Sequence, residues 1–174
     1  MVEKIVGTIV GLFSGLQGVP FGRELVVFII SLMPILELRG GLIAASILKV
    51  SFVKAFIICF IGNIIPVPFI LLLIEKVFNL LKKINWFNKI ITKLENKTLK
   101  KKDQIEKYGY LGLLMFVGIP LPGTGAWTGS LLAVLLNLDK KKSFVTISLG
   151  ILLAGIIMSI ISYGILGNLF YIVY

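Results

Sequence analysis

Two long apolar stretches constrain this chain more than any other feature of its sequence. Residues 52–74 contain a single charge, Lys54, near their start, and residues 143–174 contain none. A helix of about 20 apolar residues is long enough to cross the hydrocarbon core of a bilayer, which is about 30 Å thick. The chain of 174 residues is 57% hydrophobic and only 15% charged, whereas soluble domains are about a quarter charged. We therefore predict an all-helical integral membrane protein.

The net charge of +10 is concentrated beside these stretches. Most of the lysines lie in residues 76–107, and a second cluster is formed by Lys140, Lys141 and Lys142. Lysines next to membrane segments mark the cytoplasmic side and contact anionic lipid headgroups. The pattern favours membrane lipids as partners over nucleic acid, and it predicts that the basic insert and the loop 140–142 are both cytoplasmic.

The chain is predicted to form one membrane domain, residues 1–174, with four parts. Residues 1–22 are a short apolar segment, which either spans the membrane or lies in its interface. Residues 23–74 form a first repeat, residues 75–107 a basic insert, and residues 108–174 a second repeat. Each repeat contains an apolar segment, a Pro/Gly break and a long span. Pro120 follows Pro34 by 86 residues, and residues 40–45 align with residues 125–130 at an offset of 85.

The basic insert has a helical pattern of its own. Its apolar residues recur at helical spacing with lysines between them, which predicts an amphipathic helix in the membrane interface. The charged stretch after Leu94 is predicted to end, if it is helical, at Gly109. The apolar positions are Val77, Leu80, Ile84, Phe87, Ile91 and Leu94.

Each broken stretch is either one kinked transmembrane helix or a hairpin that enters and leaves on the same side. The arms of the first, residues 24–36 and 40–48, are too short to span singly at 1.5 Å per residue. Only hairpins place both lysine clusters on one face, which the positive-inside rule makes cytoplasmic. The hairpins also invert the second half relative to the first. The predicted fold is thus an inverted repeat of a re-entrant helical hairpin plus a transmembrane helix, as in many secondary transporters.

Glu37 and Arg39 are the sharpest functional signal, because ionisable residues inside membrane segments are costly and mark functional sites. Glu37 is a candidate carrier of a proton or a sodium ion, and Arg39 a candidate ligand of phosphate or carboxylate, with Gly40 beside them. The alternative is a structural Glu–Arg pair that ties the hairpin together.

The second break combines prolines that fix the chain with glycines that allow a close backbone approach to a ligand. If a helix begins near Thr124, its amides favour an anion or the Glu37 carboxylate. Thr124, together with Glu37, is a candidate sodium ligand. The alternative is a tight helix crossing that needs small residues. The candidate residues are Pro120, Pro122, Gly123, Thr124, Gly125, Trp127 and Thr128.

Other features are less specific. Asn63, Pro66 and Pro68 interrupt the first long span and suit a hinge, an ion ligand or, more simply, a packed kink in which Asn63 bonds a neighbour. The sequence contains no histidine, so His-based metal sites and triads are excluded. We therefore expect neither an enzyme nor a cofactor other than the coupling ion.

The two break motifs, residues 34–41 and 120–129, resemble the signatures of the small multidrug export family of bacteria and archaea. This family is thought to be related to the DedA superfamily of membrane proteins. The resemblance covers residues 24–164, and it implies opposed re-entrant hairpins, a prokaryotic plasma membrane and proton- or sodium-coupled transport, with the acidic and arginine positions at Glu37 and Arg39. DedA-type relatives are associated with polyprenyl-phosphate carriers. The chain departs from that pattern because Gly123 and Gly125 replace the acidic and arginine residues of the second hairpin.

The sequence therefore predicts an ion-coupled secondary transporter of a small amphiphilic substrate, either a lipid-phosphate carrier or a lipophilic drug, and a homodimer. A non-transporting membrane scaffold and a passive channel are the alternatives.

Overall fold

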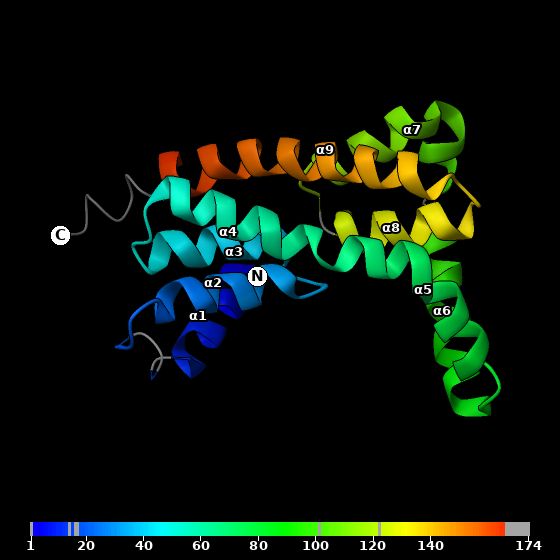
Figure 1. Ribbon diagram of the computed structural model, residues 1–174, viewed down its shortest axis with the longest axis horizontal. Helices are drawn as coiled ribbons and strands as arrows, with labels where there is room; N and C mark the ends of the chain where they lie inside the picture. The colour runs from blue at the N-terminus through cyan, green and yellow to red at the C-terminus, as the bar shows by residue number, and fades with distance from the viewer. Residues whose placement is uncertain (1, 14, 16–17, 101, 122, 166–174) are drawn as a thin grey trace. The chain divides into compact units, whose positions relative to one another are not determined.

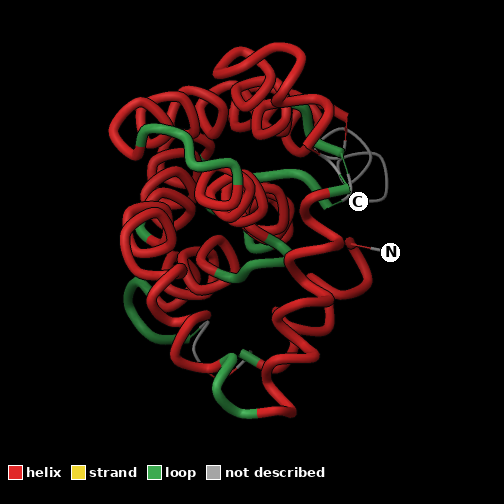
Figure 2. The backbone as a smooth tube through the Cα atoms, turned by 90° about the vertical axis from the view of Figure 1, so that its right-hand side faces the viewer, coloured by secondary structure: helices red, strands yellow, loops and turns green. Residues whose placement is uncertain are grey.

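The computed structural model describes residues 2–13, 15, 18–100, 102–121 and 123–165. These residues form helices and turns, with no strand among them (Figures 1 and 2). The chain divides into two compact units, the first comprising Met1–Ile65 and Ile151–Tyr174, and the second Pro66–Gly150. The helical class predicted from the sequence is confirmed.

The first unit is built around three helices that pack on one another, α2 (Gly22–Leu32), α3 (Glu37–Ile47) and α4 (Phe52–Ile64). Helix α1 (Val2–Leu12) packs against α3 and, with 11 residues, is only about 17 Å long. It is therefore too short to span a bilayer alone. The end of α9 (Lys140–Ser159) and a π-helical turn, η2 (Ile160–Ile165), complete the unit, and η2 contacts α3.

Helices α2 and α3 form a hairpin whose turn consists of residues 33–36. Met33 is extended, with ψ 139°, because a residue before proline is disfavoured in the helical region. Each arm has 11 residues, which corresponds to about 17 Å and is well short of a membrane span. The break begins where Pro34 predicted it, but Glu37 and Arg39 lie in the first turn of α3 rather than in the turn itself.

Small residues allow close packing at the centre of this unit. A Cβ atom at Gly41 would overlap Ser31 Oγ of α2 and lie 2.8 Å from Cys59 Sγ of α4. A Cβ atom at Gly62 of α4 would lie 3.2 Å from the carbonyl oxygen of Phe28. The three helices therefore meet at a crossing that admits only glycine at Gly41.

The end of α3 is tied down by side chains from other elements. Arg23 Nη1 donates to the carbonyl oxygen of Leu48 at 3.4 Å, and Tyr163 Oη donates to that of Val50 at 2.9 Å. Ser46 Oγ donates to the Ser162 carbonyl oxygen of η2 at 3.0 Å. The bond from Arg23, one residue into α2, thus links the start of α2 to the end of α3.

The second unit contains α5 (Pro66–Leu81), α6 (Asn85–Leu99), α7 (Lys102–Gly118), α8 (Ala126–Leu135) and the start of α9. Helix α7 consists of two helical pieces that meet at Gly109, whose φ of 57° and ψ of −133° are not helical. The predicted helix stop at Gly109 is confirmed. The second piece of α7 and α8 form a hairpin, and a Cβ atom at Gly129 would lie 2.6 Å from Val117 Cγ2.

The single amphipathic helix predicted for the basic insert is wrong, because residues 82–84 form a turn that separates α5 from α6. Val77 and Leu80 belong to α5. Ile91 of α6 is buried in a cluster with Phe78 and Leu131, and Lys82 forms an ion pair with Glu95 at 2.7 Å. Part of the apolar stripe of α6 therefore packs against α5 and α8 instead of lipid.

Two helical stretches of the described chain have the length and composition to cross a membrane. These are Phe52–Leu81, with 30 residues and a hydropathy of 2.7, and Lys140–Gly164, with 25 residues and a hydropathy of 2.6. The first continues past residue 74, where the sequence placed its end. Of the second predicted span, residues 166–174 lie outside the described part.

The ends of α3 and α8 have the same backbone geometry. Lys49 and Asn137, 88 residues apart, are both left-handed, with φ of 55° and 53°. The glycines at close contacts recur at the same spacing: Gly41 with Gly129, and Gly62 with Gly150. At this spacing residues 40–45 would pair with residues 128–133, whereas the sequence aligned them with residues 125–130; the repeat itself stays a prediction. The matching hydrogen bonds are Lys49 N–Ser46 O (3.1 Å) and Val50 N–Ala45 O (2.9 Å), and Asn137 N–Val134 O (3.0 Å) and Leu138 N–Ala133 O (2.9 Å), which is the Schellman pattern of a helix end.

Candidate functional site

Glu37, the first residue of α3, is a buried carboxylate in an apolar setting. Only 4% of its surface is exposed, and its neighbours Leu36 and Leu38 are equally buried. Its backbone is left-handed, with φ 52°, which costs about 1–3 kcal/mol for a residue that is not glycine. A buried charge and a strained backbone at the same residue are typical of functional sites.

Arg39 accompanies Glu37 in the first turn of α3 and is half-buried. Electrostatic attraction from the Glu37 carboxylate acts on its guanidinium group, as expected for opposite charges in a region of low dielectric. Gly40 is packed against the preceding turn, since a Cβ atom there would lie 2.6 Å from Leu36 Cβ. The structure thus brings together the three candidate residues of the first break, and both the ion-binding and the structural reading of the pair remain open.

The second break is a loop between α7 and α8. Gly123 and Gly125 have φ of 76° and 134°, which explains the need for glycine at these two positions. Pro120 is half-buried, and Pro122 lies outside the described residues. Helix α8 begins at Ala126, two residues later than the start near Thr124 that the sequence predicted.

Thr124 holds this loop together. Its hydroxyl donates to the carbonyl oxygens of Ile119 at 3.1 Å and Leu121 at 2.8 Å. A hydroxyl has a single proton, so the two carbonyl oxygens share the hydrogen of Thr124. Trp127 and Thr128 follow in the first turn of α8, and both are half-buried.

An apolar groove of about 380 Å³ runs along α7 up to this loop. Tyr108 and Thr124 supply its hydroxyl groups, and Leu111, Met115 and Leu121 are each about half exposed. The groove is large enough for the hydrophobic part of a small amphiphile. Its α7 residues follow helical spacing, Tyr108, Leu111, Gly112 and Met115, a signal that sequence reasoning missed.

The candidate residues fall into two sets. Glu37, Arg39 and Gly40 belong to the first unit, and residues 120–128 belong to the second. Each set is assembled within its own hairpin, and the approach of one set to the other stays a prediction.

Asn63 of α4 was given a minor role by the sequence, and its environment gives it a larger one. It is 3% exposed, and its Oδ1 atom has no hydrogen-bond partner among the residues that the structure describes. The sequence favoured a packed kink with Asn63 bonded to a neighbour, and for the Oδ1 atom this prediction is wrong. The signal that could have found it is the clustering of Asn63 with Pro66 and Pro68 inside an apolar span.

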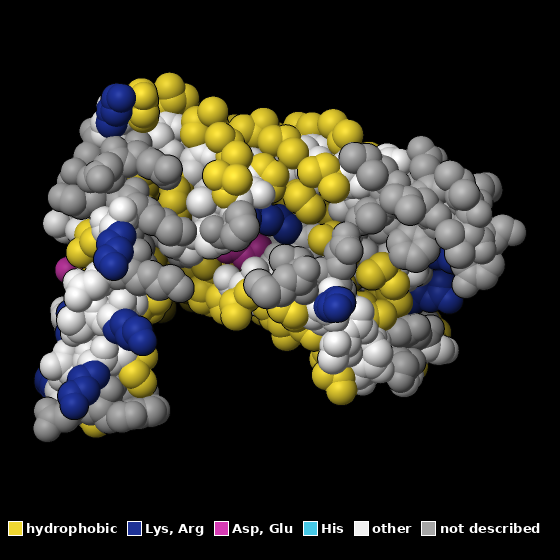
Figure 3. Space-filling view, turned by 180° about the vertical axis from the view of Figure 1, so that it is seen from behind, with side chains coloured by type: hydrophobic (Ala, Val, Ile, Leu, Met, Phe, Trp, Pro, Cys, Tyr) yellow, Lys and Arg dark blue, Asp and Glu magenta, His cyan; other side chains and the backbone are white. Residues whose placement is uncertain are grey.

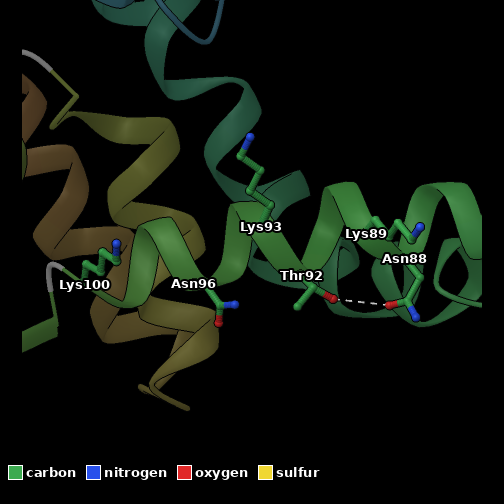
Figure 4. A pocket seen from close by; sticks show the side chains of 6 residues that line it. All are labelled: Asn88, Lys89, Thr92, Lys93, Asn96 and Lys100. Atoms are coloured by element: carbon green, nitrogen blue, oxygen red, sulfur yellow. Dashed lines mark hydrogen bonds between the residues drawn. The ribbon is translucent and has the colours of Figure 1, made fainter.

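The polar face of α6 carries lysines and no acidic side chain (Figure 4). The Thr92 hydroxyl donates a hydrogen bond to Asn88 at 3.3 Å along one edge of this surface, and Lys93 projects from the opposite edge. In the space-filling view, Lys and Arg side chains follow one another along this helix (Figure 3). We call this surface the lysine face of α6; it consists of Asn88, Lys89, Thr92, Lys93, Asn96 and Lys100.

Among the described residues, no group of three His, Cys, Asp or Glu side chains is placed to hold a metal ion. The single cysteine, Cys59, is buried.

Comparison with protein families identifies a relationship for most of the chain. A family profile described as "Putative small multi-drug export protein" matches residues 37–157. The match begins at Glu37 and includes every candidate residue of both breaks. No curated protein and no solved structure matches the chain. Since the profile covers more than half of the sequence, the chain belongs to this family of small multi-drug export proteins.

Proposed function

We propose that this protein is an ion-coupled secondary transporter that exports a small amphiphilic compound, and that Glu37 carries the coupling ion. The observation that supports this most is the buried carboxylate of Glu37 at the start of α3, 4% exposed and attracted to Arg39. A carboxylate in an apolar membrane segment is costly, and it is useful where it can alternately bind and release a proton or a sodium ion.

The lengths of the hairpin arms are an argument for a central cavity in the proposed transporter. Arms of 11 residues are too short to cross a bilayer, so the turn between them lies within the membrane if the hairpin is re-entrant. Main-chain groups of a turn at that depth must be buried by protein or line a water-filled cavity. Two such hairpins, related as an inverted repeat, would enclose a central site between them. The recurrence of the α3 helix end 88 residues later in α8 favours this repeat.

The substrate is proposed to be amphiphilic because apolar and charged features occur together. The groove beside α7 suits a hydrophobic body, and the family description favours a drug-like compound. Arg39 suits a phosphate group, so a polyprenyl phosphate, as implied by a DedA relationship, is the second candidate. Glycines at positions 123 and 125 leave the second hairpin without charged ligands for that headgroup.

Transport by reconstituted protein tests the proposal. Liposomes containing the protein would be loaded with a lipophilic cation, and its efflux measured under an imposed proton gradient and, separately, a sodium gradient. We expect gradient-driven efflux that is abolished by Glu37→Gln. Glu75→Gln is the matched control, because it makes the same change at an exposed carboxylate of α5.

The alternatives give different results in the same assay. A scaffold would show no efflux in the unmodified protein, and Glu37→Gln would alter only its thermal stability. A passive channel would release the cation equally with and without a gradient. Binding can be followed separately by Trp127 fluorescence after Trp86→Phe, since the chain has two tryptophans; titration with the cation or a polyprenyl phosphate would then identify the substrate class.

A further inference from the structure

Asn63 is an unusual residue for the interior of an apolar helix. It is 3% exposed, and within the described ranges of the chain its Oδ1 atom has no hydrogen-bond partner. A buried carbonyl-type oxygen without a donor is destabilising. A bound water molecule or ion is one explanation of such an atom in a native protein.

The topology of the first unit brings Asn63 to the same end as Glu37. Helices α3 and α4 lie side by side and run in opposite directions, joined by the short connection 48–51 (Figure 1). Gly41 of α3 is opposite Cys59 of α4. Glu37 precedes Gly41 by one helical turn, and Asn63 follows Cys59 by one turn. In an antiparallel pair these two buried residues therefore occupy the same level.

Two main-chain oxygens are added at that level by the prolines that follow. A proline has no N–H, so Pro66 and Pro68 cannot donate to the carbonyl groups four residues earlier. Those carbonyl groups belong to Gly62 and Ile64, on either side of Asn63. Carbonyl oxygens released in this way are the ligands with which broken membrane helices bind sodium ions.

The chemistry of this set suits a small monovalent cation. All of its ligand atoms are oxygens, which hard cations prefer. Glu37 is the single carboxylate, and Arg39 partly balances its charge, so a divalent ion would be poorly neutralised. A proton would need the Glu37 carboxylate alone, and it would leave the Asn63 oxygen without a role.

We propose that Asn63 Oδ1, the Glu37 carboxylate and the main-chain oxygens of Gly62 and Ile64 form a sodium site, and that sodium is the coupling ion. The second half of this inference rests on the proposed transport function, whereas the binding site itself does not.

Sodium binding to the purified protein tests the site directly. Binding of radioactive ²²Na⁺ would be measured at equilibrium in detergent, with choline as the replacement cation and potassium as competitor. Thermal unfolding would be followed over the same sodium concentrations. We expect saturable binding and a rise in Tm with sodium but not with potassium, since a ligand of the native state raises its stability.

Asn63→Leu separates a ligand from a packing residue. Leucine has a similar size and removes the unpaired oxygen, so we expect the variant to fold, with an unchanged or higher Tm in sodium-free buffer. Its sodium affinity should fall by about tenfold or more, as when a supporting ligand is lost from other metal sites. Asn63→Asp keeps an oxygen at this position and should retain binding. Asn79→Leu, at an exposed position of α5, should behave as the unmodified protein.

The outcomes distinguish this inference from the proposed function. Sodium binding that is lost in Asn63→Leu and Glu37→Gln supports the site, even if the liposomes show no transport. Efflux driven by a proton gradient without any sodium binding overturns the sodium site and leaves the transporter standing. Sodium binding unaffected by Asn63→Leu also overturns the inference.

Discussion

At the residue scale, the first unit depends on a few positions where no other side chain fits. Gly41 lies where α2, α3 and α4 cross, against Ser31 and Cys59. One turn away from it, Glu37 is both buried and left-handed. The tight crossing provides a rigid support for a residue whose own backbone is unfavourable. Gly41 therefore serves the packing of the helices, whereas Glu37 is the candidate functional residue, although the two lie one turn apart in the sequence.

Replacing Gly41 by alanine is expected to destabilise the protein by about 1–3 kcal/mol, because the added methyl group overlaps Ser31 Oγ and approaches Cys59 Sγ. Thermal unfolding in detergent would measure the effect. Gly11→Ala is the control, since nothing lies within 4 Å of a Cβ atom there. Adding Ser31→Ala should restore part of the stability lost in Gly41→Ala. An unchanged Tm in Gly41→Ala would show that the crossing is looser than described.

At the scale of the elements, α6 presents three different surfaces. Ile91 packs inward against Phe78 and Leu131. Ile90 and Leu94 are 47% and 43% exposed, and the lysine face lies next to them on the helix. An exposed apolar edge beside a cationic face is the arrangement of helices that lie in the membrane interface. We therefore expect lipid to contact the exposed apolar edge and the lysine face of α6, whereas the surface that carries Ile91 packs inside the protein.

Changing Lys89, Lys93 and Lys100 together to glutamine should weaken the interaction with anionic lipid. Each lysine near an anionic surface contributes about 1 kcal/mol, so the apparent affinity should fall by about two orders of magnitude for the three. Short-chain phosphatidylglycerol would be titrated into the detergent-solubilised protein, and the shift in Tm compared with that caused by phosphatidylcholine.

Salt provides the control for this experiment. The effect of phosphatidylglycerol on the unmodified protein should decrease as the ionic strength is raised, because salt screens exposed charges. The triple variant should be insensitive to salt. Equal responses to both lipids in the unmodified protein would refute the assignment of the lysine face.

Much of the fold follows from patterns that the sequence displays openly. Proline and glycine positions predicted the break after Leu32 and the kink at Gly109, and the absence of charge predicted both long helices. The turn at residues 82–84 was missed because the apolar spacing of α5 continues into α6 across it. The sequence aligned the two halves after the turn through Gly40 and Gly125, whereas the close contacts of Gly41 and Gly129 recur at a spacing of 88 residues, which the sequence alone does not reveal. For the site, charge identified Glu37, but the unpaired state of Asn63 depends on packing that no spacing reveals.

At the scale of the molecule, two units share two continuous helical connections, one through residues 65–66 and one through residues 150–151. The first unit holds Glu37 and the second holds the glycine-rich loop. Each unit contains one helical hairpin, and its helix end recurs in the other.

The predicted topology can be tested by labelling single introduced cysteines with a membrane-impermeant maleimide. Lys93→Cys and Lys141→Cys replace exposed residues, and both should react in inside-out vesicles and remain unlabelled in intact cells. Phe21→Cys, at a position 78% exposed, should react in intact cells, because both ends of a re-entrant first hairpin face outward. The native Cys59 is buried and serves as the unreactive background.

The two readings of the broken stretches differ in this experiment. If each stretch crossed the membrane instead of returning, residues 93 and 141 would be labelled from opposite sides, and the inverted repeat would have to be abandoned.

The pair Pro66 and Pro68 also has a mechanical consequence. A helix resists bending largely through its main-chain hydrogen bonds, and Pro66 and Pro68 cannot donate two of these bonds in the stretch Phe52–Leu81. This compliant point coincides with the boundary between the two units at residues 65–66. A cation bound to the carbonyl oxygens of Gly62 and Ile64 would stiffen the helix at this point. Bending of the helix would in turn change the positions of these oxygens. Cation binding and bending of the helix are therefore coupled, because both involve the same oxygen atoms, and each changes the equilibrium of the other.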